Sequence, residues 1–313
     1  MNRVDVHRVM TELADLLHLQ IYPESDRLEQ ETLAWFDALD LSGIPLVSKE
    51  KLRTYEFARG VGASLPTAEF STVLWWSKFT LWYMIIDDNY AETAAVHDLA
   101  GYLGTVGEIW RISQDTMPPE LPGTPLASVL NELLDELDSL VNSCIAARIR
   151  HALRDYFFAA AWEAAARSAG SLPDPSAYHT FRRHFALFVL NVEFVEHLPG
   201  LLLTDDERRI PEVRKLRALA CDVMGDINVL CSLRKEVTVN NFFLPEVTSS
   251  SENLNEYAST LPVLCRSQAR EILQLGRMLA PDPKLSSYAT AIAKWVAGTT
   301  WWHQQALRHR YQA

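Results

Sequence analysis

Apolar side chains recur along most of this chain at the three- and four-residue spacing that is typical of amphipathic helices. Strand-like alternation of apolar and polar residues is rare. A long stretch without Gly or Pro predicts one long helix, with Thr67 as its N-cap. The preceding helix is expected to end at Gly60. The pattern predicts helices over residues 4–18, 24–41, 49–60, 67–92, 93–114, 126–167 (one or two helices), 176–198, 216–239, 252–279 (restarted at Pro262) and 283–311.

These helices predict one all-α bundle. The 313 residues are enough for a large domain with a sizeable core, and 48% of them are hydrophobic. Gly occurs only 12 times, which also favours helices. We expect a single domain over residues 1–313, in which roughly residues 1–20 form a flexible or additional N-terminal segment.

Charge and targeting signals narrow the function classes. The formal net charge of -11 argues against a nucleic-acid partner. No apolar run reaches the roughly 18 to 20 residues that span a bilayer, and the N-terminus lacks the apolar stretch of a signal peptide. A cytoplasmic protein is therefore expected. The cysteines are far apart in apolar surroundings and are interpreted as buried free thiols: Cys144, Cys221, Cys231 and Cys265.

The first candidate site follows the apolar run of residues 81–86, where Asp87 and Asp88 stand together and Glu92 follows. Ionised carboxylates at the end of a buried helix are costly unless a positive charge meets them. No basic residue is near in sequence, so a divalent metal such as magnesium is one interpretation. The alternative is that the acidic pair simply ends the helix in water.

A second candidate site lies on the helix near residue 230. Asn228, Ser232 and Glu236 stand at i, i+4 and i+8, which places them on one stripe of a helix. An amide oxygen, a hydroxyl and a carboxylate in a row can chelate a hard cation. Three ordinary polar residues facing water are the alternative, but Cys221 and Met224 on the preceding turns indicate a buried stripe.

Arginines complete the candidate chemistry. Arg182 and Arg183 interrupt an otherwise apolar stretch, and Arg310 and Tyr311 lie near the end of the chain. The planar guanidinium is suited to diphosphate, although each arginine alone could form a surface salt bridge. If the two acidic helices face one another, the cavity between them would bind several metal ions and a polyanion.

Together these residues resemble the bacterial class I terpene synthases, from about residue 20 to the C-terminus. Residues 87–92 match the DDxxxE form of the family's acidic motif, and Asn228, Ser232 and Glu236 match its Asn-Ser-Glu triad. Arg182 stands 46 residues before Asn228, where the family carries a diphosphate-sensing arginine, and a terminal Arg-Tyr pair is present.

Two positions depart from the family pattern. Val229 replaces an Asp that is not usually a metal ligand. Phe185 stands where an acid often links the sensing arginine to the effector position, which is Ala186 here; its backbone carbonyl is expected to face the substrate.

The resemblance implies a class I terpenoid synthase fold with a central active-site cavity, an isoprenyl diphosphate substrate and three Mg²⁺ ions. Farnesyl diphosphate is favoured, with geranylgeranyl diphosphate second, and a homodimer is possible. Magnesium would activate the diphosphate as leaving group, and the resulting carbocation would cyclise until proton loss or water capture.

The resemblance also implies roles for individual residues. The implied metal ligands are Asp87, Asp88, Asn228, Ser232 and Glu236. The implied diphosphate ligands are Arg182, Lys235, Arg310 and Tyr311, and Glu92 would orient the acidic motif.

Aromatic faces can stabilise a carbocation without attacking it. On the helix that precedes Asp87, Tyr83, Thr80 and Trp76 share the face of Asp87. Helices that face this one could add further residues to the wall of the pocket. The expected pocket residues are Trp76, Phe79, Thr80, Tyr83, Met84, Phe185, Ala186, Val189, Cys221, Met224 and Trp302.

Three other functions are compatible with parts of the pattern. A chain-elongating prenyltransferase would carry an acidic motif in both halves, whereas the second half here has the Asn-Ser-Glu form. A di-iron carboxylate bundle needs two Glu-x-x-His repeats, and the chain offers only the segment from Glu193 to His197. A non-catalytic helical interaction protein would show no magnesium-dependent turnover.

Overall fold

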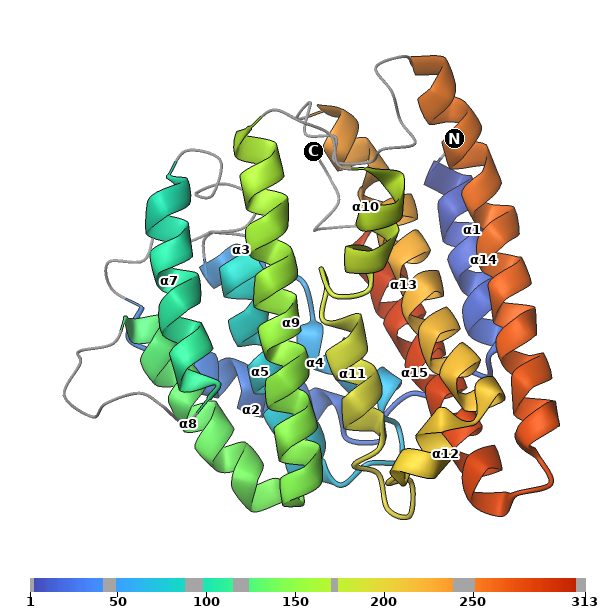
Figure 1. Ribbon diagram of the computed structural model, residues 1–313, viewed down its shortest axis with the longest axis horizontal. Helices are drawn as coiled ribbons and strands as arrows, with labels where there is room; N and C mark the ends of the chain where they lie inside the picture. Colours follow the sequence, from blue (N-terminus) through green and yellow to red (C-terminus); the bar gives the residue numbers. More distant parts are fainter. Residues whose placement is uncertain are drawn as a thin grey trace.

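The computed structural model describes residues 3–41, 49–87, 98–114, 124–169, 174–238 and 251–307, and within these ranges the chain forms helices and no strands (Figure 1). The predicted all-α fold is confirmed. The helices are α1 (Arg3–Leu16), α2 (Ser25–Ala38), α3 (Lys49–Arg53), α4 (Phe57–Ser64), α5 (Phe70–Ile86), α7 (Leu99–Ile112), α8 (Pro125–Leu140), α9 (Ser143–Ser168), α10 (Pro175–Arg182), α11 (Phe188–Val195), α12 (Asp205–Arg209), α13 (Pro211–Thr238), α14 (Ser251–Leu279) and α15 (Pro283–Ala306).

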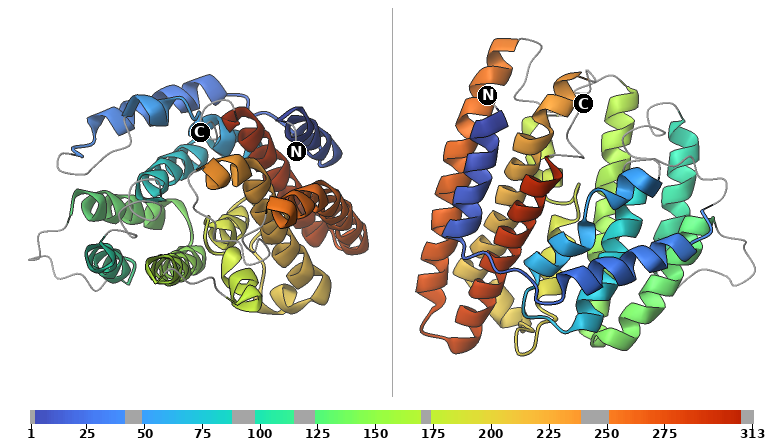
Figure 2. Two further views of the ribbon diagram at one scale, coloured as in Figure 1. Left: turned by 90° about the horizontal axis from the view of Figure 1, so that it is seen from above. Right: turned by 180° about the vertical axis from the view of Figure 1, so that it is seen from behind.

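The helices form two groups that meet at the middle of the molecule. Seen from above, α7, α8 and α9 lie on one side, while α13, α14, α15 and α1 lie on the other (Figure 2). Helix α5 packs on α8 and α4, and α4 packs on α15, so these contacts join the two groups. Helix α11 makes a second connection because it contacts α9, α13 and α15.

Helix α5 is buried because it is apolar on nearly all sides. The indole N–H groups of Trp75 and Trp82 are inside the core and donate to main-chain carbonyls of α8, at 2.7 Å from Leu133 O and 2.9 Å from Leu126 O. These bonds fix the helix axially against α8. The expected start at Thr67 is wrong: α5 begins at Phe70 after a turn.

Helices α4 and α15 approach so closely that glycine is required between them. A Cβ built at Gly298 would lie 2.1 Å from the carbonyl oxygen of Ala63, and one at Gly60 would lie 2.7 Å from Cβ of Trp302. Just beside this contact the hydroxyls of Ser64 and Thr299 are 3.0 Å apart. The two backbones are therefore in direct contact along one wall of the bundle.

Three other helix predictions need correction. The expected helix over residues 49–60 is two helices, α3 and α4, and Gly60 lies inside the second. The expected helix over residues 176–198 is interrupted between Arg182 and Phe188. Helix α14 runs through Pro262 without restarting.

The N-terminal segment belongs to the bundle. Helix α1 packs against α14 and α15, and Val9, Met10 and Leu13 are buried in the common core. The described residues 3–16 therefore pack as a helix of the bundle. Of the four cysteines, Cys221, Cys231 and Cys265 are buried free thiols as expected, but Cys144 is exposed. No helix in the described ranges has the length and apolar character needed to cross a membrane.

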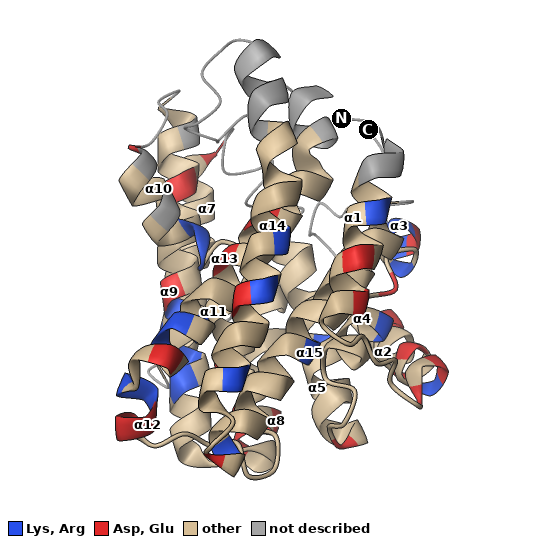
Figure 3. Ribbon diagram, turned by 90° about the vertical axis from the view of Figure 1, so that its right-hand side faces the viewer, with Lys and Arg blue, Asp and Glu red and all other residues tan. Residues whose placement is uncertain are grey.

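The end of the bundle that carries α12 contains a network of paired charged side chains, which we call the closed-end network. Its carboxylates are Glu193 and Glu196, and Arg148, Arg208 and Arg217 surround them. Lys/Arg and Asp/Glu residues are interspersed around α12 and the adjoining part of α9 in Figure 3. Although burial opposes it, Arg208 and Arg217 hold the pKa of Glu193 below its usual value.

Candidate active site

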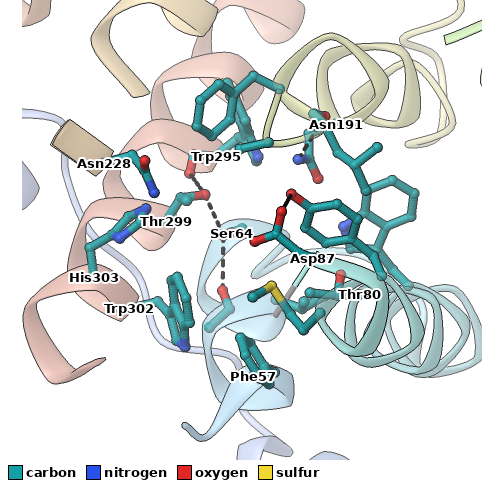
Figure 4. Close-up of a pocket in the computed structure, with 18 residues that line it drawn as sticks. Phe57, Ser64, Thr80, Asp87, Asn191, Asn228, Trp295, Thr299, Trp302 and His303 are labelled. Atoms are coloured by element: carbon teal, nitrogen blue, oxygen red, sulfur yellow. Dashed lines mark hydrogen bonds between the residues drawn. The ribbon is translucent and has the colours of Figure 1, made fainter. Parts of the chain in front are cut away.

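A cavity opens between α4, α5, α11, α13 and α15 (Figure 4). Its empty space is about 770 Å³, counting the space at its open mouth. Most of the wall is apolar or aromatic, and the polar groups are concentrated on a few positions. The lining residues are Phe57, Gly60, Val61, Ser64, Trp76, Thr80, Tyr83, Met84, Asp87, Ala186, Leu187, Phe188, Asn191, Asn228, Trp295, Thr299, Trp302 and His303.

Asp87 stands at the C-terminal end of α5, where the apolar helix finishes at the cavity. Its Oδ1 lies 3.3 Å from the hydroxyl of Tyr83, one turn earlier on the same helix. The helix C-terminus carries the negative end of the backbone dipole, so a carboxylate there favours a cation. Asp87 is therefore positioned to bind a positive group at the edge of an apolar chamber.

Asn228 lines the same cavity from α13, on the opposite side from Asp87 in Figure 4. Its Oδ1 accepts a hydrogen bond of 2.9 Å from Nη2 of Arg182, which also donates to the carbonyl of Gly225 at 3.0 Å. The structure thus brings Asp87 and Asn228 to one hollow, and Arg182 is hydrogen-bonded to Asn228. Ser232 lies one turn beyond Asn228 on α13 and is half-buried.

The donor chemistry of this hollow fits a hard divalent cation. A carboxylate, an amide oxygen and a hydroxyl are ligands that Mg²⁺ accepts, and an amide oxygen that already receives one hydrogen bond keeps a second lone pair. The described residues contain no group of three His, Cys, Asp or Glu side chains that could hold a metal by themselves. Asn228 and Ser232 are the non-carboxylate oxygen donors that the sequence analysis assigned to this site.

Several predicted site residues lie outside the described part of the chain. They are Asp88, Glu92, Arg310 and Tyr311, together with the side chains of Lys235 and Glu236. Their assignment stays a prediction from sequence.

The interruption between α10 and α11 forms part of the cavity wall. The main chain turns tightly at residues 183–187, and Leu187 has φ 57 and ψ 19, in the left-handed region that branched side chains rarely adopt. The side-chain amide of Asn191 donates to the Leu187 carbonyl at 3.0 Å and so supports this conformation. As a result Ala186 and Leu187 reach the cavity, whereas an unbroken helix would direct its main chain elsewhere.

The pocket residues that were expected from the sequence divide into two groups. Those that line the cavity are Trp76, Thr80, Tyr83, Met84, Ala186 and Trp302. Those that do not are Phe79, Phe185, Val189, Cys221 and Met224.

The second group packs elsewhere for visible reasons. Phe79 is fully buried and stacks on Trp75 and Trp76, with ring centroids 5.3 Å and 5.5 Å away. The ring of Phe185 turns toward Trp162, at 6.1 Å. Burial also raises the pKa of the Cys221 thiol to about 12, so this side chain is a neutral packing group.

Other lining residues were missed by the sequence analysis. They come from α4, α11 and the middle of α15, namely Phe57, Gly60, Val61, Ser64, Leu187, Phe188, Asn191, Trp295, Thr299 and His303. On α15 a signal was present, because Trp295, Thr299 and Trp302 recur at helical spacing with polar neighbours. On α4 and α11 no local pattern distinguishes a residue facing the cavity from one facing the core.

The polar part of the cavity could hold an anion through arginine and metal ligands, and the aromatic part of its wall could hold an apolar chain.

Comparison with known proteins agrees with this interpretation of the cavity. The sequence model of terpene synthase family 2, C-terminal metal binding, matches residues 78–244. This match covers slightly more than half of the chain and includes Asp87, Arg182 and Asn228.

Individual relatives are distant but extend over almost the whole chain. The chain is 24% identical to (12E)-labda-8(17),12,14-triene synthase from Streptomyces cyslabdanicus, over 92% of this chain and 88% of that protein. It is 24% identical to 4-epi-cubebol synthase ((2E,6E)-farnesyl diphosphate cyclizing) from Streptosporangium roseum, over 90% and 84%. The solved structure of linalool/nerolidol synthase from Streptomyces clavuligerus with 2-fluorogeranyl diphosphate matches with a TM-score of 0.73 at 18% identity, over 94% of this chain and 97% of that one.

Proposed function

The chain belongs to terpene synthase family 2 and is a terpene cyclase, and on this premise we propose that it acts on farnesyl diphosphate with the help of three Mg²⁺ ions. Geranylgeranyl diphosphate is the second candidate. One relative is named for cyclising farnesyl diphosphate, which supports the first candidate, and the diterpene synthases among the relatives support a twenty-carbon substrate as the second. A homodimer and a cytoplasmic location stay predictions.

The observation that carries the proposal is that Asp87 and Asn228 line one cavity and that Arg182 is hydrogen-bonded to Asn228. Asp87, Asn228, Ser232 and Glu236 would hold the metal ions, with Asp88 as a further ligand. When bound, these ions supply Lewis-acid stabilisation of the departing diphosphate. Arg182 would donate charge-assisted hydrogen bonds to the same oxygens, and Lys235, Arg310 and Tyr311 would add to them.

The chain's own walls would govern the carbocation that remains after diphosphate leaves. Trp76, Trp295 and Trp302 present aromatic surfaces to the cavity, which stabilise positive charge without forming a bond to it. The close packing of α4 on α15 seals one wall against water. The reaction would end by proton loss or by capture of a water molecule.

The test is incubation of the purified protein with the ten-, fifteen- and twenty-carbon allylic diphosphates and Mg²⁺. Diphosphate release and the volatile products would be measured by coupled assay and mass spectrometry. We expect the highest kcat/KM with farnesyl diphosphate, a cyclic fifteen-carbon product, and complete loss of turnover on chelation. Failure to release diphosphate from any of the three would contradict the proposal.

A second arm separates the chain-elongating alternative. Isopentenyl diphosphate would be added together with each allylic diphosphate. A cyclase is expected to give the same products as before, while an elongating prenyltransferase would make a longer diphosphate.

A further inference from the structure

The hydroxyl of Tyr83 lies between two acceptors on different parts of the active site. It is 3.3 Å from Oδ1 of Asp87, and 3.2 Å from the main-chain carbonyl oxygen of Phe185. A phenol has one hydrogen, so it can fully serve only one of these acceptors at a time. Which acceptor receives the hydrogen therefore links the charge at Asp87 to the turn that joins α10 to α11.

That turn also positions Arg182. It begins directly after Arg182, whose guanidinium bonds to Asn228 on α13, and it ends at Leu187 in the left-handed region. Only two residues, Arg183 and His184, stand between Arg182 and Phe185. A change in how the Phe185 carbonyl is held therefore acts on a short, tightly turned segment, and not on a flexible linker.

The rings on both sides are fixed by packing, so the hydroxyl can act without them moving. The Tyr83 ring is buried and meets Tyr156 edge-on, with centroids 5.1 Å apart. The Phe185 ring lies against Trp162 and Tyr178, at 6.1 Å and 6.0 Å. With both rings held, the hydroxyl and the carbonyl stay within hydrogen-bonding distance of each other.

The acceptor strengths decide where the hydrogen goes. An ionised carboxylate is a stronger acceptor than a neutral carbonyl, so Asp87 takes the hydrogen as long as no metal ion neutralises its charge. A carboxylate whose charge is neutralised by a cation is a weaker acceptor, and the neutral Phe185 carbonyl then competes successfully.

We propose that Tyr83 is a positioning residue that couples cation binding at Asp87 to the placement of Arg182, by transferring its hydrogen bond from Asp87 to the Phe185 carbonyl. The inference rests on the proposed function, because it takes Asp87 as a metal ligand. It assigns Tyr83 a role in assembling the diphosphate site in addition to lining the cavity. The expected acidic link at position 185 is absent from this chain, and the Tyr83 bond connects the same turn to the acidic helix.

The test compares Tyr83→Phe with Tyr156→Phe. Both remove one phenolic oxygen and keep the ring, and the Tyr156 hydroxyl is buried without a hydrogen-bond partner among the described residues. Calorimetry would measure Mg²⁺ binding alone, and then inorganic diphosphate binding at saturating Mg²⁺. For Tyr83→Phe we expect about tenfold weaker diphosphate binding, the loss of one hydrogen bond, with Mg²⁺ binding unchanged or slightly tighter. Tyr156→Phe should match wild type.

Turnover gives the second measurement. Tyr83→Phe should lower kcat/KM about tenfold while the ratio of products stays as in wild type. Wild-type diphosphate affinity in Tyr83→Phe would overturn the coupling, as would an equal loss in Tyr156→Phe. A changed product ratio with unchanged diphosphate binding would make Tyr83 a carbocation contact instead. If wild-type protein itself binds no Mg²⁺ with diphosphate, the proposed function fails together with the coupling.

Discussion

The two ends of the bundle use charged residues in opposite ways. At the end that carries α12, the closed-end network pairs two buried carboxylates with three arginines. At the other end, Asp87 and Asn228 line a cavity, and Arg182 donates a hydrogen bond to the neutral amide of Asn228. Figure 1 shows α12 and α10, the helix that ends in Arg182, at opposite ends of the molecule.

The difference shows how one bundle can be both stable and reactive. Buried ions are costly unless partners neutralise them, and the closed end meets this requirement entirely within the protein. The cavity end places an amide oxygen and a carboxylate on the wall where the proposed metal ions would bind. Stability and metal binding should therefore respond to mutations at different ends.

The largest expected effect is on catalysis, from Asp87→Asn. Loss of the carboxylate should lower diphosphate release about 1000-fold, comparable to removing a major electrostatic group from a transition state. Glu236→Gln should also reduce it greatly. The melting temperature of Asp87→Asn should stay close to wild type, since the helix end gains a neutral isostere.

The matched control for that variant is Asp206→Asn. This carboxylate is at the α12 end, with a side chain that is 95% exposed and pairs with Arg209. It should leave turnover unchanged. Near-normal turnover in Asp87→Asn would refute the metal assignment.

The next effect is on stability, from Glu196→Gln. Its carboxylate is inaccessible to solvent and contacts Arg148, Arg208 and Arg217. Removing its charge leaves arginines without sufficient compensation, and we expect a loss of about 3 kcal/mol in unfolding free energy by denaturant titration. The kcat of the folded fraction should not change. A large fall in kcat at full folding would mean that the two ends are not independent.

A smaller effect on stability is expected at Glu29, because less positive charge compensates its buried carboxylate. Burial raises the pKa of Glu29 to about 7, against an ordinary value of 4.5, and its carboxylate accepts a hydrogen bond from the backbone N–H of Arg59. The folded state holds this proton more tightly than the unfolded state, so stability falls as pH rises from about 4.5 to 7 and is then constant.

Glu29→Gln should therefore be more stable than wild type at pH 8, by about 1 to 2 kcal/mol once partial exposure is allowed for. At pH 4 the two proteins should unfold at similar denaturant concentrations. A constant difference across this pH range would show that ionisation of Glu29 is not responsible.

Much of the architecture was predictable because helix starts are local signals. The Thr124-Pro125, Asp174-Pro175 and Asp282-Pro283 pairs each give a side-chain cap followed by proline, and α8, α10 and α15 begin there. The meeting of Asp87 with Asn228 and Arg182 also agrees with the motif spacing. These features depend on short-range sequence or on recurring motif order.

The interruption between α10 and α11 could not be predicted in this way. It contains neither Gly nor Pro, and Leu187 adopts a left-handed conformation that its side chain disfavours. Its carbonyls accept a long-range hydrogen bond from Tyr83 on α5 and a local one from the side chain of Asn191 on α11, and neither bond is visible in a helical pattern. The prediction that Phe79 and Phe185 line the cavity is wrong for the same reason. Helical spacing shows which residues share a helix face, but it does not show whether that face meets the cavity or another helix.

The contact between Gly298 and Ala63 has a consequence for engineering the product. Any side chain at position 298 would collide with a backbone oxygen, which cannot rotate away, so a substitution there would push α4 and α15 apart instead of reshaping the cavity locally. Chamber size is therefore changed more readily by trimming or enlarging the side chains that line the cavity. Variation in ring size among engineered descendants should consequently map to residues such as Phe57, Met84 and Trp295, and not to helix spacing.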